Sequence, residues 1–173
     1  GCLVSVSLFP YIHTARWLCA LDLYVVDSSA GKYVPVPAHI RFYYFLARNS
    51  QYENVSPFPK GLRILSGDPN NKSPTNVATF ICQVNADFSN SLVSNNFNCN
   101  RDCPWGMKTE LFFPPCWDGV NLYKSDGSHM NWPDNGVRSG SCPWSHPVRL
   151  PAIQLEYTWA TSNYNPDQAL SGK

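Results

Sequence analysis

Carboxylates crowd the second half of the chain, in one long connection and in two segments with strand character: Asp118, Asp126, Asp134, Glu110 and Glu156. Glycoside hydrolysis requires two carboxyl groups, one on each side of the scissile bond. We expect Glu156 and Asp118 to form this pair. Glu156 would share a strand face with Gln154 and Thr158, and partial burial there would suit it to act as the general acid.

These acids also have a simpler interpretation. Asp118 and Asp126 each precede a glycine, a pattern typical of turns in which the aspartate accepts hydrogen bonds from nearby backbone. Glu156 would then lie on a solvated strand face. The sequence does not give the separation of two carboxyl groups, so catalysis and turn formation both remain open.

Two histidines in the same region, His129 and His146, have the chemistry to shuttle a proton or, with a neighbouring aspartate, to hold a divalent ion. Structural hydrogen bonding is the favoured alternative, and we expect neither a metal nor a cofactor. The chain has no Gly-x-Ser-x-Gly, phosphate-binding loop or His-Glu-x-x-His. Serine hydrolase, nucleotide-dependent and zinc-peptidase chemistries therefore lose most of their support.

Aromatic residues accompany these acids between residues 105 and 144, where four tryptophans occur: Trp105, Trp117, Trp132 and Trp144. Tyr123 lies among them. Aromatic faces stack on the C–H surfaces of sugars without needing charge. We therefore predict sugar platforms at Trp117, Trp132, Trp144 and Tyr123. The alternative is that the tryptophans cover disulfides.

Composition limits the class of partner. The 173 residues include 13 Lys+Arg against 12 Asp+Glu, a net charge of +1, and no basic run, so nucleic acid is an improbable ligand. No apolar run approaches the length of a membrane span, which argues against a membrane anchor. The length suits one domain, and we expect a monomer.

Seven cysteines are present, and five of them fall in one stretch: Cys82, Cys99, Cys103, Cys116 and Cys142. We expect disulfides among these five, as is typical of secreted proteins. Zinc is the alternative, with Cys99, Cys103 and Cys116 joined by a histidine, but structural zinc sites usually show two close ligand pairs. Cys2 or Cys19 is the candidate for the odd thiol.

Strand-forming patterns recur along the chain, at 21–26, 33–36, 40–47, 61–66, 77–83, 109–113 and 152–159. Segment 40–47 is expected to be a central strand, and a single turn of helix is expected near 85–92. A long connection covers 114–151. We infer an antiparallel β-sandwich or jelly-roll-like fold with long disulfide-tied loops and little helix. Residues 1–17 are set apart as an atypical segment before a single domain at 18–170.

Several unusual phrases are shared with one family: Gly67-Asp68-Pro69, Phe112-Phe113-Pro114-Pro115-Cys116-Trp117-Asp118-Gly119-Val120-Asn121-Leu122, Ser128-His129-Met130, Cys142-Pro143 and His146-Pro147-Val148-Arg149-Leu150-Pro151. In these the chain resembles the fungal secreted family DUF1996, whose members often carry a WSC carbohydrate-binding module. The resemblance implies a cell-wall polysaccharide of the β-glucan type as partner, and it makes Asp68 a site candidate. Family segments expected before and after this region are missing, and Ala160 stands where an aspartate is common, so we expect a truncated chain.

We therefore expect a secreted, cell-wall-associated fungal protein, an endo-β-1,3-glucanase with Glu156 and Asp118 as its acids. His129 and His146 would support them. The alternative is a noncatalytic glycan-binding or structural module, or an inactive truncated member of the family.

Overall fold

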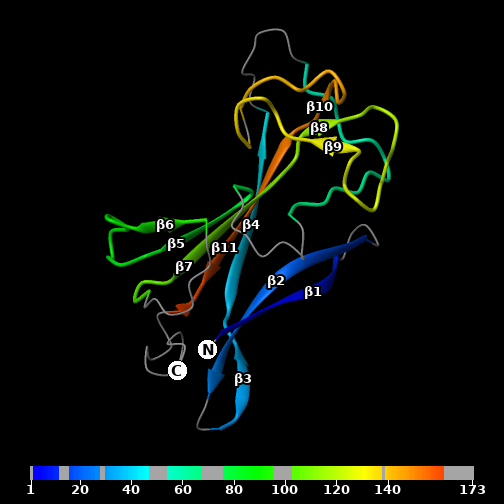
Figure 1. The fold of residues 1–173 in the computed structure, drawn as a ribbon. Coiled ribbons are helices and arrows are strands. Elements are labelled where there is room, and N and C mark those ends of the chain that lie inside the picture. Colours follow the sequence, from blue (N-terminus) through cyan, green and yellow to red (C-terminus); the bar gives the residue numbers. More distant parts are fainter. Residues whose placement is uncertain are drawn as a thin grey trace. The chain divides into compact units, whose positions relative to one another are not determined.

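A computed structural model of the protein describes residues 2–11, 16–27, 30–46, 54–67, 76–95, 103–137 and 139–161. The regular elements among these residues are strands (Figure 1), joined by long turns and irregular segments: β1 (Cys2–Tyr11), β2 (Arg16–Asp27), β3 (Lys32–Pro35), β4 (Ala38–Phe45), β5 (Ala78–Cys82), β6 (Leu92–Ser94), β7 (Met107–Phe113), β8 (Cys116–Trp117), β9 (Met130–Asn131), β10 (Val148–Arg149) and β11 (Ala152–Trp159). The expected fold class, mainly β with antiparallel sheets, disulfide-tied loops and little helix, is confirmed.

The strands belong to three sheets. Their orders are β1-β2-β3, β10-β8-β9 and β4-β11-β7-β5-β6. The pairs β1–β2, β2–β3, β5–β6, β8–β9 and β8–β10 are all antiparallel. Strand β1 falls in the segment 1–17 that the sequence sets apart.

The chain divides into two compact units, which we call unit 1 and unit 2. Unit 1 consists of residues 1–39, 80–108 and 157–173, and unit 2 of residues 40–79 and 109–156. The core of unit 1 includes Leu23, Val36 and a stacked pair, Tyr157 and Trp159, whose ring centroids are 5.2 Å apart. The core of unit 2 includes Phe112, Met130, Leu150 and Leu155.

Five of the predicted strands are confirmed. Segments 21–26, 33–36, 77–83, 109–113 and 152–159 coincide with or overlap β2, β3, β5, β7 and β11. The hairpin between the first two is in place, since Val25 pairs with Val34 in the β2–β3 ladder. These segments are short and locally patterned, which is the condition under which alternation indicates a strand reliably.

Three predictions need correction or refinement. Segment 40–47 overlaps β4, but β4 is an edge strand with mostly exposed side chains, and its predicted central position is wrong. The β-propensity of a segment shows that its side chains suit a pleated sheet. It does not show whether the strand lies at the centre or at the edge of that sheet. Segment 61–66 is not a strand, and Arg63 N–H donates one backbone hydrogen bond, to Leu122 O at 2.9 Å. The helical turn expected near 85–92 is absent: the chain makes non-helical turns there, with Phe88 and Asn90 at positive φ.

Candidate functional site

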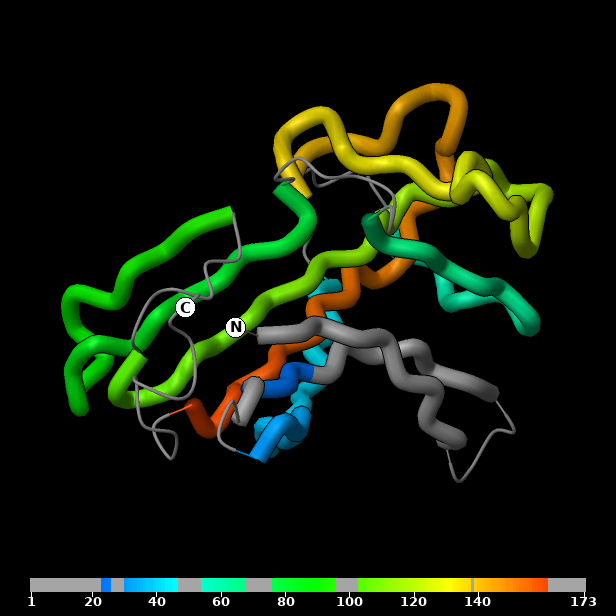
Figure 2. Tube along the Cα trace, turned by 60° about the horizontal axis from the view of Figure 1, so that its bottom comes forward, coloured from blue at the N-terminus to red at the C-terminus, as the bar shows by residue number. Residues whose placement is uncertain are grey.

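The long connection 114–151 of unit 2 is a folded structure of its own. Its two ends lie side by side (Figure 2), because Trp117 on β8 pairs with Val148 on β10. Strand β8 also pairs with β9, where Trp117 faces Met130. A disulfide joins Cys116 to Cys142. Three short strands and one covalent link therefore hold the part of the chain that carries Asp118, Asp126, His129, His146, Trp117, Trp132 and Trp144.

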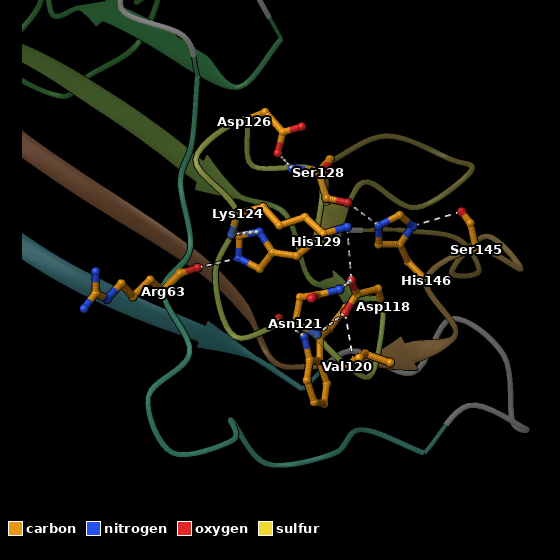
Figure 3. Close-up of polar contacts among 11 residues, drawn as sticks. Arg63, Asp118, Val120, Asn121, Lys124, Asp126, Ser128, His129, Ser145 and His146 are labelled. Carbon is orange, nitrogen blue, oxygen red and sulfur yellow. Dashed lines mark hydrogen bonds and ion pairs between the residues drawn. The ribbon is translucent and has the colours of Figure 1, made fainter.

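Asp118 follows β8 and closes a tight turn (Figure 3). Its Oδ1 accepts the backbone N–H groups of Val120 and Asn121, both at 2.9 Å, and its Oδ2 accepts the Asn121 side-chain amide at 2.7 Å. Lys124 Nζ lies 3.7 Å from Oδ2. Desolvation raises the pKa of Asp118, but these hydrogen bonds and the nearby Lys124 ammonium together lower it to about 2.

His129 is buried completely beside this turn. Its Nε2–H donates to the Arg63 carbonyl oxygen at 2.6 Å, and its Nδ1 accepts the Lys124 backbone N–H at 3.2 Å. The Tyr123 ring meets the imidazole edge-on, with centroids 6.0 Å apart. Because one ring nitrogen donates and the other accepts a hydrogen bond from backbone groups, His129 fixes the loop.

His146 and Asp126 make similar local contacts. The Nε2–H of His146 donates to Ser128 O at 3.0 Å, and Ser145 Oγ lies 2.9 Å from its Nδ1. Asp126 Oδ1 accepts the Ser128 backbone N–H at 3.0 Å, and this hydrogen bond lowers the pKa of Asp126. Asp118, Asp126, His129 and His146 thus all make hydrogen bonds that hold the long connection, which are the contacts that their structural interpretation predicts.

Glu156 lies in a different environment from Asp118. It is buried on β11, with 7% of its surface exposed. Its Oε1 lies 3.4 Å from both Arg41 Nη1 and Tyr43 Oη, two residues of β4. Asp118 instead contacts residues of its own turn. The two acids of the predicted pair therefore belong to separate local networks.

The predicted sugar platforms differ greatly in exposure. Trp117 is half-buried, and its indole N–H donates to Asn121 O at 2.7 Å. Trp132 is also half-buried. Tyr123 is 45% exposed, with the Arg63 guanidinium 5.4 Å from the centre of its ring. Trp144 is 96% exposed, so it is the platform that presents most of its surface to solvent.

Within the described residues, disulfides join Cys82 to Cys103 and Cys116 to Cys142. Four of the five predicted cysteines are therefore paired, and the zinc alternative fails for Cys103 and Cys116. The fifth, Cys99, lies outside the described residues, as does the site candidate Asp68. Among the residues that the structure describes, no three His, Cys, Asp or Glu side chains gather to hold a metal ion.

The family of the chain follows from its sequence match. The family model described as a domain of unknown function (DUF1996) matches residues 14–172. The chain belongs to this family. No curated protein and no solved structure matches this DUF1996 chain. In the described part of the chain, no helix is long and apolar enough to cross a membrane.

Two contributors to the DUF1996 site were not predicted. The Asn121 side chain completes the cradle around Asp118, and the backbone carbonyl of Arg63 fixes the His129 ring. Asp-Gly-x-Asn at 118–121 is a turn sequence, so the first contact had a local signal. The second joins residues 66 positions apart and uses a backbone atom, which no side-chain motif reveals.

Proposed function

We propose that this DUF1996 chain binds a neutral polysaccharide of the β-glucan type without hydrolysing it. The observation that carries the proposal is Trp144, a large aromatic side chain that is 96% exposed two residues after a disulfide-bonded cysteine. A tryptophan left in water loses the free energy that burial would give it. Binding to a ligand with an apolar face recovers that free energy.

Further exposed apolar side chains lie in the same connection, at Val120, Leu122 and Tyr123. The disulfide and the strands β8, β9 and β10 hold the connection in one conformation, so little conformational entropy is lost on binding. A net charge of +1 favours an uncharged ligand. These features together support a glycan over a charged polymer.

The chemistry of Asp118 favours binding over hydrolysis. Three N–H groups satisfy its carboxylate and its pKa is about 2, so at neutral pH it has no proton to donate. Inverting and retaining glycosidases both need a second carboxyl group close to the first. Asp118 and Glu156 sit in separate networks, which weakens their assignment as that pair.

Hydrolysis by an endo-β-1,3-glucanase remains the second candidate, favoured by the burial of Glu156 among Arg41 and Tyr43. Release of reducing ends from soluble β-1,3-glucan tests it. Turnover by the wild type that is lost in Glu156→Gln, at unchanged stability, would support hydrolysis over simple binding.

The compartment belongs to the same proposal. Disulfides persist in oxidising environments such as the secretory pathway and the cell exterior, and the described part of the chain contains Cys82–Cys103 and Cys116–Cys142. We propose secretion, and we propose the fungal cell wall as the place where the glycan is met.

Depletion from solution by insoluble β-1,3-glucan tests the binding function. Trp144→Ala should weaken retention about tenfold, because an aromatic contact of roughly 1.4 kcal/mol is lost. Val93→Ala, which removes an exposed aliphatic side chain on β6, outside the long connection, is the matched control and should bind within about twofold of the wild type. Equal retention of all three proteins would exclude the Trp144 surface.

A further inference from the structure

Unit 1 contains an open pocket of about 370 Å³. It lies between the start of β4, the turn before β7 and the end of β11, and its lining includes His39, Trp105, Gly106 and Thr158. Pockets that take small ligands begin at about 300 Å³ and combine apolar walls with a few polar groups. This pocket meets both conditions, and it involves none of the residues placed in the long connection.

The wall that carries Trp105 is held rigidly. A disulfide joins Cys82 to Cys103, and Gly106 N–H donates to Cys103 O at 2.9 Å. Trp105 N–H donates to Gln83 O at 3.0 Å, and Gln83 N–H donates to Gly106 O at 2.9 Å. The turn is therefore fixed on both sides of Trp105. Even so, Trp105 is 54% exposed, so its ring is positioned without being buried.

Gly106 makes this turn possible. Its φ is +102°, and a Cβ atom there would lie 3.0 Å from the Trp159 carbonyl oxygen. Only glycine adopts this backbone conformation without strain and leaves room for the strand beside it. The close approach of the turn to β11 places Trp105 at the pocket.

The opposite wall is tied to the end of β11. Ala160 N–H donates to Pro37 O at 2.9 Å, just before His39. The buried Thr161 hydroxyl donates to Cys103 O at 3.2 Å and so connects β11 to the Trp105 turn. Both walls thus share β11 as a common support, and the shape of the pocket is formed before any ligand arrives.

The lining chemistry selects the ligand. The described residues that line the pocket include no carboxylate, lysine or arginine. Trp105 offers an aromatic face, the exposed His39 a ring nitrogen, and Thr158 a hydroxyl group. An aromatic face beside a few neutral hydrogen-bonding groups matches a sugar ring, which has apolar C–H faces and hydroxyl groups at its edge.

We propose that this pocket binds one sugar ring at an end of a neutral glucan chain, a second site distinct from the Trp144 surface. The class of ligand rests on the proposed function, whereas the pocket itself does not. The ring stacks on Trp105, and its hydroxyl groups exchange hydrogen bonds with His39 and Thr158. The small volume suits a chain end, and the openness allows the rest of the chain to leave.

Titration of the full chain with the β-1,3-linked disaccharide laminaribiose tests the proposal, followed by saturation-transfer NMR. We expect Trp105→Ala to weaken binding about tenfold and Trp105→Phe, which keeps an aromatic face, to weaken it much less. Thr158→Val removes a hydroxyl at nearly constant volume and should weaken binding roughly threefold. Val93→Ala, which removes an exposed aliphatic side chain on β6 outside the pocket, should leave disaccharide affinity unchanged.

Each outcome separates this proposal from the proposed function. No binding of laminaribiose by the wild type, or equal binding by Trp105→Ala of wild-type stability, overturns the pocket while retention on insoluble glucan still tests Trp144. Loss of disaccharide binding in Trp144→Ala alone would place the sugar in the long connection and also overturn the pocket. If disaccharide binding depends on Trp105, the pocket is supported. If Trp144→Ala is also retained on insoluble glucan as well as the wild type, the Trp144 surface is excluded.

Discussion

The His129 ring donates a hydrogen bond from Nε2 to the carbonyl oxygen of Arg63 at 2.6 Å, across 66 positions of sequence. This contact links the segment 54–67 to the long connection inside unit 2. It also explains why a histidine is buried completely in a loop. An imidazole offers a donor and an acceptor on opposite sides of a flat ring, and both are used here.

Replacement of His129 should therefore destabilise the protein. His129→Ala removes two hydrogen bonds and opens a cavity, and we expect the free energy of unfolding to fall by roughly 2–4 kcal/mol. His146→Ala is the control, because His146 is only half-buried. This substitution should lower the free energy of unfolding by less than about 1 kcal/mol. Denaturant titration measures both. A stable His129→Ala protein that has lost only an activity would show that His129 has a chemical role.

The lowered pKa of Asp118 should make the free energy of unfolding depend on pH in the acidic range. Its pKa is about 2 in the folded chain against an ordinary 3.8, so the carboxylate stabilises the fold above pH 3.8, and this stabilisation is lost as the pH falls toward 2. Asp118→Asn keeps an oxygen for the backbone N–H groups but does not titrate. We expect it to be about 1 kcal/mol less stable at neutral pH.

The two unfolding curves should converge as the solution is acidified. At about pH 2 the wild type has lost most of the contribution of the Asp118 charge, so its free energy of unfolding should approach that of Asp118→Asn. Parallel curves from neutral pH to pH 2 would mean that the turn does not stabilise the ionised form. Urea titrations at a series of pH values distinguish the two results.

Gly140 should tolerate no side chain. A Cβ there would contact the Asp134 carboxylate and lie 2.6 Å from Asn135 N, and φ is +95°. Gly136 has a similar φ of +85° but nothing within 4 Å of its Cβ position. Gly140→Ala should therefore be about 1–3 kcal/mol less stable than Gly136→Ala, since only the first adds a steric clash. Equal losses would show that backbone strain alone decides both substitutions.

The Cys116–Cys142 disulfide should contribute strongly to stability. It closes a loop of 26 residues, and chain entropy alone predicts about 3–4 kcal/mol. The double variant Cys116→Ala/Cys142→Ala should lose about that much free energy of unfolding. It should also be retained less by insoluble glucan, because Trp144 is then no longer anchored. Unchanged retention by the double variant would show that Trp144 is ordered without the covalent link.

Local patterns predicted what local chemistry determines. The strand 152–159 follows from its own alternation and coincides with β11, and Asp118 before Gly119 indicated the turn that the structure contains. The edge position of β4 had no such signal. It depends on which strand lies beside β4, and the Arg41–Glu156 contact that joins β4 to β11 spans 115 positions.

In the candidate site, too, some features follow from the local sequence and others depend on the tertiary structure. Exposure separates Trp144 from Trp117, although both follow a cysteine closely in the sequence. Trp117 is held by the carbonyl of Asn121 within its own turn, whereas the side chain of Trp144 is almost fully exposed. Residue type predicted aromatic platforms, but only the tertiary arrangement decides which of them a ligand can reach.

Oxidation of tryptophans by N-bromosuccinimide, with and without saturating β-1,3-glucan and read by peptide mass spectrometry, locates the glycan most directly. Trp144 should oxidise fastest in the free protein and become protected when glucan is bound, while the half-buried Trp117 and Trp132 should react slowly in both samples. Oxidation of Trp144 at the same rate in the presence of bound glucan would contradict its role as the binding platform.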